Sequence, residues 1–361
     1  MKIFIIGLLA MVCVALKSNA QDVVDTITIS KTKTLSIIGV GDIMLGSSYP
    51  SENYLPTNKD CSLLLFDVKN ILLSADLTVG NLEGCFSDNA PLVKKCKDTT
   101  VCYAFRMPEK FAGCFKDAGF DVLTIANNHS GDFGELGRKT TVKLLDSLNI
   151  YHAGWIQYPT AIFSKDSITY GIAAFAPNSG TVSITDLGAA KEIIKELRSK
   201  CDIVIATFHG GAEGSAHQHV TRKTEEFYGE NRGNVYEFSH ALIDAGADII
   251  FGHGPHVPRA VELYKNKFIA YSLGNFCTYG QFNLKGPNGL APIVKLEINL
   301  NGDFLSGQII SAKQPGRIGT VLDENHGAAK LIKELTRVDF PESELNIDET
   351  GNITKLPLDK P

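Results

Sequence analysis

The chain has 361 residues, of which 44% are hydrophobic and 21% are charged, so it has enough apolar material for one large domain or two smaller ones. Its 35 Lys and Arg residues against 40 Asp and Glu residues give a formal charge of -5. This balance disfavours nucleic acid as a partner, because binding to a phosphate backbone requires an excess of basic side chains.

The N-terminal segment has the pattern of a signal peptide over residues 1–20. Lys2 precedes an apolar run from Ile3 to Leu16, and Ser18-Asn19-Ala20 follows as a cleavage point. The run is shorter than the roughly 18 apolar residues that a membrane-spanning helix requires, and no later stretch reaches that length. We therefore expect an exported protein, periplasmic or extracellular, with no transmembrane segment in the mature chain.

Seven cysteines follow this segment, at positions 61, 85, 96, 102, 114, 201 and 277. Disulfides persist in exported proteins, and the odd number leaves at least one thiol free. Cys96 and Cys102 flank a short polar loop that a disulfide could close, so they are a candidate pair whose geometry the sequence does not supply. The cysteines lack the paired CxxC spacing of a structural zinc site.

Short apolar runs that end near Gly, Asn or His recur along the chain, and segments with helical spacing lie between several of them. The runs are residues 35–40, 77–80, 122–126, 203–207, 249–251 and 268–272. The helical stripes are residues 64–72, 142–148, 193–197 and 238–243. Short apolar runs are typical of strands buried on both faces, and their alternation with helices predicts an α/β fold with a largely parallel core.

Three further segments complete the predicted organisation. Residues 292–310 alternate in polarity around Asn301-Gly302, which predicts an antiparallel hairpin. The polar stretch 212–234, which includes His217 and His219, is interpreted as a flexible lid over the site. Residues 341–361 are polar with scattered prolines and are predicted to form a loosely packed tail.

Polar side chains with ligand chemistry follow directly after the predicted strands. They are Asp42, Glu83, Asn128, His129, His209, His253 and His256. Each one alone has an ordinary structural explanation, such as a helix cap for Asp42 or a turn for the Asn pair. Because ligands in open α/β sheets gather beyond the carboxyl ends of the strands, the whole set predicts a common site. Mixed carboxylate, amide and imidazole donors suit Mn²⁺, Zn²⁺ or Fe, so we expect a divalent metal ion there.

The segment Gly252-His253-Gly254-Pro255-His256 is the most specific local feature. Two imidazoles three residues apart on a rigid loop can face one cavity, and Arg259 follows as a candidate partner for an anion. The alternative is a rigid turn that exposes its histidines to solvent.

At these residues the sequence resembles the CapA family of poly-gamma-glutamate capsule synthesis proteins, whose fold is related to calcineurin-like metallophosphoesterases. The resemblance rests on six blocks in the family's order, at residues 41–45, 81–84, 126–129, 209–213, 246–256 and 271–276. It implies a four-layer α/β/β/α sandwich, a CapA-like domain over residues 33–340, and a metal site at the strand ends.

The resemblance also implies roles for single residues. Asp42, Glu83, Asn128, His209, His253 and His256 are the implied metal ligands, and His129 is the implied catalytic imidazole, acting as general acid for the leaving group. Glu213 and Arg259 are expected to contact the substrate. Two positions depart from the phosphoesterase pattern, because Met44 stands where a His ligand is expected and Glu83 stands where Asp is usual. One ion or two are both compatible with these residues.

The leading hypothesis is a metal-dependent hydrolase or transferase that acts on a phosphoester or on an amide-linked anionic polymer. The alternative is a non-catalytic protein of cell-envelope assembly that uses the same pocket to hold an anionic polymer or an envelope-assembly partner. A purely structural envelope domain is a third possibility.

Overall fold

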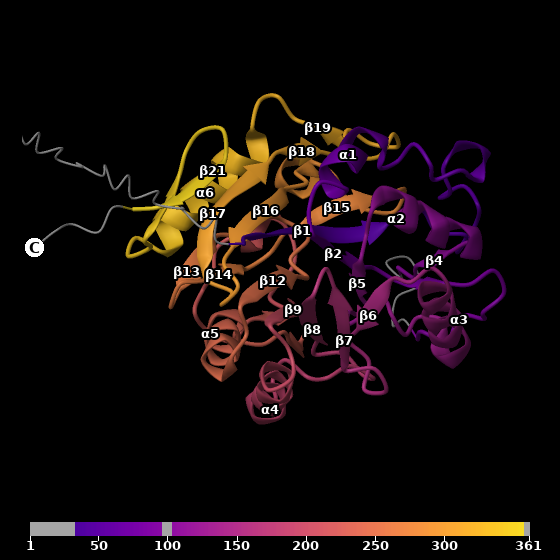
Figure 1. The fold of residues 1–361 in the computed structure, drawn as a ribbon. Coiled ribbons are helices and arrows are strands. Elements are labelled where there is room, and N and C mark those ends of the chain that lie inside the picture. The colour runs from indigo at the N-terminus through magenta and orange to yellow at the C-terminus, as the bar shows by residue number, and fades with distance from the viewer. Residues whose placement is uncertain (1–32, 96–102, 357–361) are drawn as a thin grey trace, which may run out of the picture. The chain divides into compact units, whose positions relative to one another are not determined.

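The computed structural model describes residues 33–95 and 103–356. The predicted signal peptide and the candidate Cys96–Cys102 pair lie outside these residues. The predicted alternation of strands and helices is confirmed: two mixed sheets carry most of the strands, and the main helices lie against their outer faces (Figure 1).

The larger sheet has nine strands and contains both parallel and antiparallel pairs. Its strands are β1 (Leu35–Met44), β2 (Leu77–Leu82), β5 (Val122–Thr124), β6 (Tyr151–Ala153), β15 (Asn275–Thr278), β16 (Ile293–Ile298), β17 (Phe304–Ile310), β20 (Leu345–Ile347) and β21 (Asn352–Lys355). Strand β1 pairs in parallel with β2 and β15 and antiparallel with β16. The predicted hairpin at 292–310 is confirmed by the antiparallel pairing of β16 with β17.

The smaller sheet has six strands and a mainly parallel centre. Its strands are β7 (Thr160–Lys165), β8 (Ile168–Phe175), β9 (Ile203–His209), β12 (Ile249–His253), β13 (Val261–Tyr264) and β14 (Lys267–Ala270). Three two-stranded pairs lie apart from both sheets, namely β3 (Cys85–Phe86) with β4 (Arg106–Met107), β10 (Glu226–Phe227) with β11 (Glu230–Asn231), and β18 (Ala312–Lys313) with β19 (Val321–Leu322).

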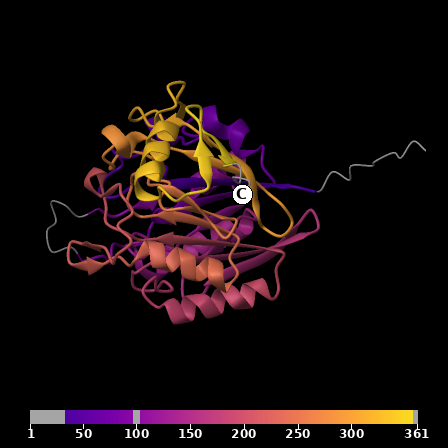
Figure 2. The same ribbon diagram turned by 90° about the vertical axis from the view of Figure 1, so that its left-hand side faces the viewer.

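Buried side chains give the order of the layers. Ile37 and Val79 of the larger sheet pack with Ile205 of the smaller sheet in one apolar cluster, so this cluster lies between the two sheets. The other face of the larger sheet packs against α1 (Lys69–Leu72), α2 (Ala112–Ala118) and α3 (Gly134–Ser147). The other face of the smaller sheet packs against α4 (Leu187–Arg198) and α5 (Val235–Ala245), which run side by side in Figure 2. This order of helices, sheet, sheet and helices is the predicted four-layer sandwich.

Local sequence sets the ends of the helices. Asp186 caps α4 by accepting from the Ala189 amide, and Asn234 caps α5 by accepting from the Glu237 amide. Gly246 ends α5 in the left-handed conformation. Helix α6 (Gly327–Asp339) follows later in the chain, and short 3-10 turns occupy Thr57–Lys59, Phe66–Val68, Glu109–Phe111, Ser215–His217 and Gly286–Gly289.

Two sequence-based expectations differ from the structure. The predicted loose tail is wrong over β20 and β21, because these strands add an antiparallel edge next to β17. Their apolar residues Leu345, Ile347 and Ile353 alternate with polar ones and are buried, which explains the pairing. The predicted helical stripe at 64–72 is also shorter than expected, since it is divided between a 3-10 turn and the four residues of α1.

A disulfide joins Cys61 to Cys114 across 53 residues of chain. No sequence pattern indicates this pairing, since the two cysteines are 53 residues apart and flank no common loop. Cys85, Cys201 and Cys277 are buried free thiols. No helix in the described ranges has the length and apolarity needed to cross a membrane.

Candidate metal centre

The two sheets bring three separate parts of the chain together at their strand ends. Asp42 lies on β1, and His209 and His253 are the last residues of β9 and β12. His209 and His253 are direct partners in the pairing of these two strands, so both imidazoles lie at the same edge of the sheet. His256 follows in the loop after β12 with a positive φ of 57°.

Glycines allow the strands to approach this closely. A Cβ at Gly41 would lie 2.0 Å from the carbonyl oxygen of Gly274. A Cβ at Gly252 would lie 2.4 Å from the carbonyl oxygen of Tyr271. Both positions therefore exclude any side chain, which accounts for the glycines directly before Asp42 and His253.

The distances in the cluster fit a single coordination centre. Asp42 Oδ2 lies 2.8 Å from His256 Nδ1, and Asp42 Oδ1 lies 3.5 Å from His253 Nδ1. Glu83 Oε2 lies 3.5 Å from His209 Nε2. One donor atom each from Asp42, His209 and His256 fall within 4.8 Å of one another. The central part of the predicted ligand set therefore converges.

Several polar atoms in this cluster are buried and have no hydrogen-bond partner within residues 33–95 and 103–356. They are both ring nitrogens of His209 and of His253, Oε1 of Glu83 and Oδ1 of Asn128. A buried polar atom without a partner costs about 1–3 kcal/mol, so a cluster of them requires an explanation. Neutral imidazoles and carboxylate or amide oxygens are the donors that Mn²⁺, Zn²⁺ or Fe accept, so the residues fit such an ion.

Burial and the neighbouring charges shift the pKa values of these groups. Burial lowers the pKa of His209 to about 3, which keeps its imidazole neutral and able to coordinate. Burial raises the pKa of Glu83 to about 7, and the charge of Asp42 adds to this rise. Burial lowers the pKa of His256, but the hydrogen bond and charge of Asp42 outweigh it and raise the value to about 9, so an ion that binds this imidazole would displace a proton from it. Burial raises the pKa of Asp42, yet the imidazoles of His253 and His256 hold it well below its usual range.

Two asparagines that were not among the predicted ligands hold the site together through side-chain hydrogen bonds. Asn81 is the partner of Asp42 in the pairing of β1 with β2. Its Nδ2 donates to Asp42 Oδ1 at 2.8 Å and to Glu83 Oε2 at 2.7 Å, so one amide holds both carboxylates. Asn127 donates to Asn81 Oδ1 and accepts from the His129 amide, which links this network to the next loop.

His129 has a partner that the sequence analysis missed. Its Nδ1 lies 2.7 Å from Asp132 Oδ2, and Asp132 also forms an ion pair of 3.0 Å with Lys94. Because a carboxylate only accepts, this hydrogen bond requires the proton on Nδ1 and leaves Nε2 as the second, reactive nitrogen. The spacing of three residues between His129 and Asp132 was the available signal.

A cleft with two lobes lies next to the cluster. The larger lobe has a volume of about 580 Å³ and includes His129, Glu213 and His256 among its lining residues. The smaller lobe has a volume of about 280 Å³ and includes Asn128 together with Lys94 and Arg232. Phe227 and Tyr228, from the β10–β11 hairpin of the predicted lid segment, border both lobes.

The two predicted substrate contacts are placed differently. Glu213 lines both lobes and forms an ion pair of 3.0 Å with Arg232. Arg259 is fully buried, and its two terminal nitrogens donate to Glu225 at 2.9 and 2.8 Å. Because this guanidinium already has a carboxylate partner, we do not retain Arg259 as a substrate-binding residue.

The predicted lid histidines are held away from the cluster. His219 Nδ1 lies 2.7 Å from Asp339 at the end of α6, and the His217 ring packs near Phe227. The part of this segment that borders the cleft is the β10–β11 hairpin.

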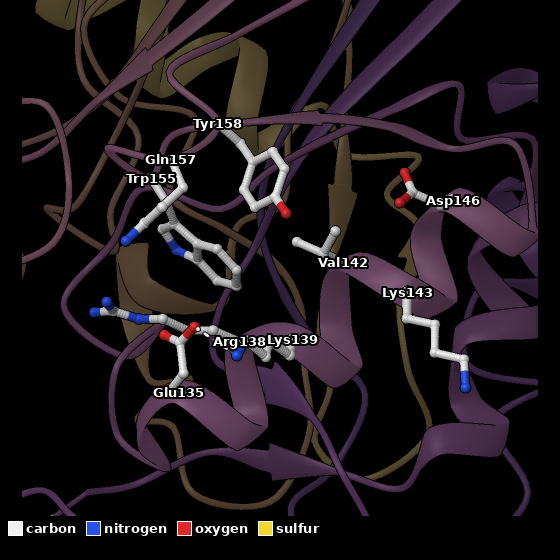
Figure 3. A pocket seen from close by; sticks show the side chains of 9 residues that line it. All are labelled: Glu135, Arg138, Lys139, Val142, Lys143, Asp146, Trp155, Gln157 and Tyr158. Atoms are coloured by element: carbon white, nitrogen blue, oxygen red, sulfur yellow. Dashed lines mark ion pairs between the residues drawn. The ribbon is translucent and has the colours of Figure 1, made fainter.

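A separate pocket of about 340 Å³ lies between α3 and residues 155–158 (Figure 3). It shares no lining residue with the cleft beside the cluster. Glu135 pairs with Lys139 there, and Asp146 pairs with His152. Its acids thus already have basic partners, and none of its lining atoms belongs to the buried unpartnered imidazoles of the cluster.

Comparison with known proteins supports the resemblance described above. A family model for the bacterial capsule synthesis protein PGA_cap matches residues 36–279, which include every residue of the cluster. The capsule biosynthesis protein CapA of Bacillus anthracis is 26% identical over 333 residues, covering 85% of this chain and 75% of the relative. The PGA biosynthesis protein CapA of Bacillus subtilis is 29% identical over 264 residues, covering 67% of this chain and 63% of the relative.

Solved structures give more distant similarities. A hypothetical protein from Thermus thermophilus aligns with a TM-score of 0.48 and 14% identity, over 78% of this chain and 100% of its own. The NAD nucleotidase of Haemophilus influenzae aligns with a TM-score of 0.41 and 11% identity, over 84% of this chain and 56% of its own.

Proposed function

This chain belongs to the PGA_cap family of bacterial capsule synthesis proteins, and we propose that it is a metal-dependent hydrolase or transferase acting on an envelope polymer of the poly-gamma-glutamate type. The observation that carries the proposal is the set of buried donor atoms on Glu83, His209 and His253, at the ends of β2, β9 and β12, that lack hydrogen-bond partners in the described part of the chain. A divalent ion held by Asp42, His209, His253 and His256, with Glu83 and Asn128 nearby, would supply Lewis acidity and activate water.

The protein's own residues have distinct tasks in this proposal. Asn81 fixes the two carboxylates, so Asp42 and Glu83 need no reorganisation when the ion binds. Asp132 orients His129 through Nδ1, and in the imidazolium form Nε2 carries the second proton, which it delivers to the leaving group. The Lys94 side chain borders the smaller lobe and, unlike that of Arg259, stays 28% exposed beside its carboxylate partner Asp132, so its ammonium group is accessible to an anionic part of the substrate.

We also propose that the protein works outside the cytoplasm, in the periplasm or beyond it. The signal-like segment 1–20 and the Cys61–Cys114 disulfide support this location, because disulfides persist in oxidising compartments.

The test is a hydrolysis screen of protein expressed from residue 21, with phosphoesters and gamma-linked glutamyl peptides as substrates. Replacing His129 by Ala should lower kcat by about 100-fold to 10,000-fold, since this is the usual contribution of a general acid. The metal content of H129A should equal that of the parent protein. His240→Ala is the matched control, because His240 also pairs with a carboxylate, Glu262, and lies outside the cleft lining.

A non-catalytic polymer-binding role is the second candidate. Met44 favours it, because this buried thioether stands where the phosphoesterase pattern has an imidazole ligand. Protein that binds gamma-linked glutamyl peptides but turns over neither substrate class would support this second role and contradict the first.

A further inference from the structure

We propose that Asn275 supplies an additional oxygen ligand to the metal centre. The inference rests on the proposed function, since it assumes that an ion binds at the cluster. Asn275 belongs to residues 271–276, the last of the six blocks that resemble the family, and it is not among the ligands proposed above.

The sheet places Asn275 beside Asp42. The two residues are direct partners in the parallel pairing of β1 with β15, and the Asp42 amide donates to the carbonyl of Gly274 at 2.9 Å. Paired residues of adjacent parallel strands project to the same face of a sheet. The side chain of Asn275 therefore lies on the face that carries the Asp42 carboxylate.

Hydrogen bonds fix which end of the Asn275 amide is free. Its Nδ2 donates to the carbonyl oxygens of His256 at 3.2 Å and Asn288 at 3.1 Å. Both partners are acceptors, so the nitrogen must face them and Oδ1 must face the other way. The side chain is held in this orientation without an ion.

Oδ1 is the one polar atom of the Asn275 side chain that has no hydrogen-bond partner in the described residues. Asn275 is 1% exposed, and Oδ1 has no hydrogen-bond partner anywhere in residues 33–95 or 103–356. Asn275 also lines the larger lobe of the cleft together with His256 and His129. An amide oxygen is an accepted ligand for a hard divalent ion, and an ion would satisfy Oδ1 together with the atoms of His209 and His253 that lack partners.

The alternative is that Asn275 only positions the loop of His256 through its nitrogen. Asn288 provides a matched control for this role, because its Nδ2 also donates to the His256 carbonyl, at 3.2 Å. A purely positioning function should therefore be shared by the two asparagines, whereas a ligand function belongs to Asn275 alone.

The experiment measures Mn²⁺ affinity by calorimetry for the parent protein, Asn275→Ala and Asn288→Ala. Asn275→Ala should weaken Mn²⁺ binding by more than about 100-fold, because the loss of outer partners of a metal ligand alone costs about 10-fold to 100-fold. Asn288→Ala removes only an outer partner of the His256 loop and should weaken binding by no more than about 10-fold to 100-fold. The visible absorption of Co²⁺-loaded protein should change in Asn275→Ala and not in Asn288→Ala, since it reports the coordination geometry.

Equal losses in the two variants would overturn the ligand role and leave positioning as the function of Asn275. Unchanged affinity in Asn275→Ala would overturn both roles while leaving the proposed function intact. A parent protein that binds no ion would overturn the proposed function itself. Circular dichroism of each metal-free variant checks that it is folded.

Discussion

Asp42 and Asp248 are both buried carboxylates in the sheet region, but their surroundings differ completely. Asp248 precedes β12 and accepts from Arg198 at 2.7 Å, from Lys267 at 2.8 Å and from the Val204 amide at 2.8 Å. Each of its oxygens therefore has a basic partner. Asp42 accepts from Asn81 and His256 but faces His253, whose two ring nitrogens have no hydrogen-bond partner in the described ranges; the nearer one, Nδ1, lies 3.5 Å from Asp42 Oδ1.

The difference in surroundings assigns a structural role to Asp248 and is the basis for proposing Asp42 and its neighbouring imidazoles as metal ligands. A buried charge whose partners are complete holds elements together, here α4, β9 and β14 around Asp248. A buried polar group with incomplete partners costs stability, and the proposed ion would supply the partners that these imidazoles lack. Substitutions in the cluster should therefore change metal affinity, whereas substitution of Asp248 should change the free energy of unfolding.

The largest effect is expected at the histidines of the cluster. His209→Leu removes a ligand while keeping a similar side-chain volume, so metal affinity should fall about 1,000-fold or more, which exceeds the 10-fold to 100-fold cost of losing an outer partner. The unfolding free energy of the metal-free protein should stay the same or rise, because two buried nitrogens without described partners are removed. Calorimetry and chemical denaturation measure the two quantities.

A metal-free H209L protein that is less stable than the parent by several kcal/mol would break the comparison. It would show that His209 serves the fold rather than a ligand.

Asp248→Ala should have the opposite profile. It leaves Lys267 and Arg198 without their carboxylate, so the unfolding free energy should fall by about 3 kcal/mol, as for other broken buried ion pairs. Metal affinity should not change in the folded protein. Urea denaturation and Mn²⁺ calorimetry on the same preparation check both statements, and a loss of affinity at full folding would contradict the structural role of Asp248.

The disulfide should contribute a comparable increment to the same stability. Replacing both Cys61 and Cys114 by Ala opens a loop of 53 residues and should lower the unfolding free energy by about 2–4 kcal/mol. The thermal midpoint of the double variant, compared with that of the buried free thiol variant Cys201→Ala, measures the effect. Equal midpoints would indicate that the bridge adds nothing to the fold.

The sequence predicted the larger architecture because buried strands leave a simple pattern. Asp42, His209 and His253 each lie directly after a predicted apolar run. Because parallel strands place their carboxyl ends at one edge of a sheet, these residues were expected to lie together. The pairing of Cys61 with Cys114 was not predictable, since it depends on how α2 packs beside the segment of Cys61.

The roles of single side chains were harder to predict, because they depend on partners from distant segments of the chain. Arg259 looked like an anion partner because its loop carries two imidazoles, yet Glu225 from a separate segment neutralises it. Asn81 and Asp132 looked like ordinary strand and turn residues. Their importance comes from neighbours that only the folded chain supplies, Glu83 with Asp42 for the first and His129 for the second.

The most direct test of a converged metal centre is a titration of the metal-free parent protein with Mn²⁺ and Zn²⁺ by calorimetry. The arrangement of Asp42, His209, His253 and His256 predicts saturable binding of at least one of these ions, with a dissociation constant of about 1 μM or lower, equivalent to about -8 kcal/mol. Binding weaker than about 1 mM for both ions, in protein shown to be folded, would contradict it.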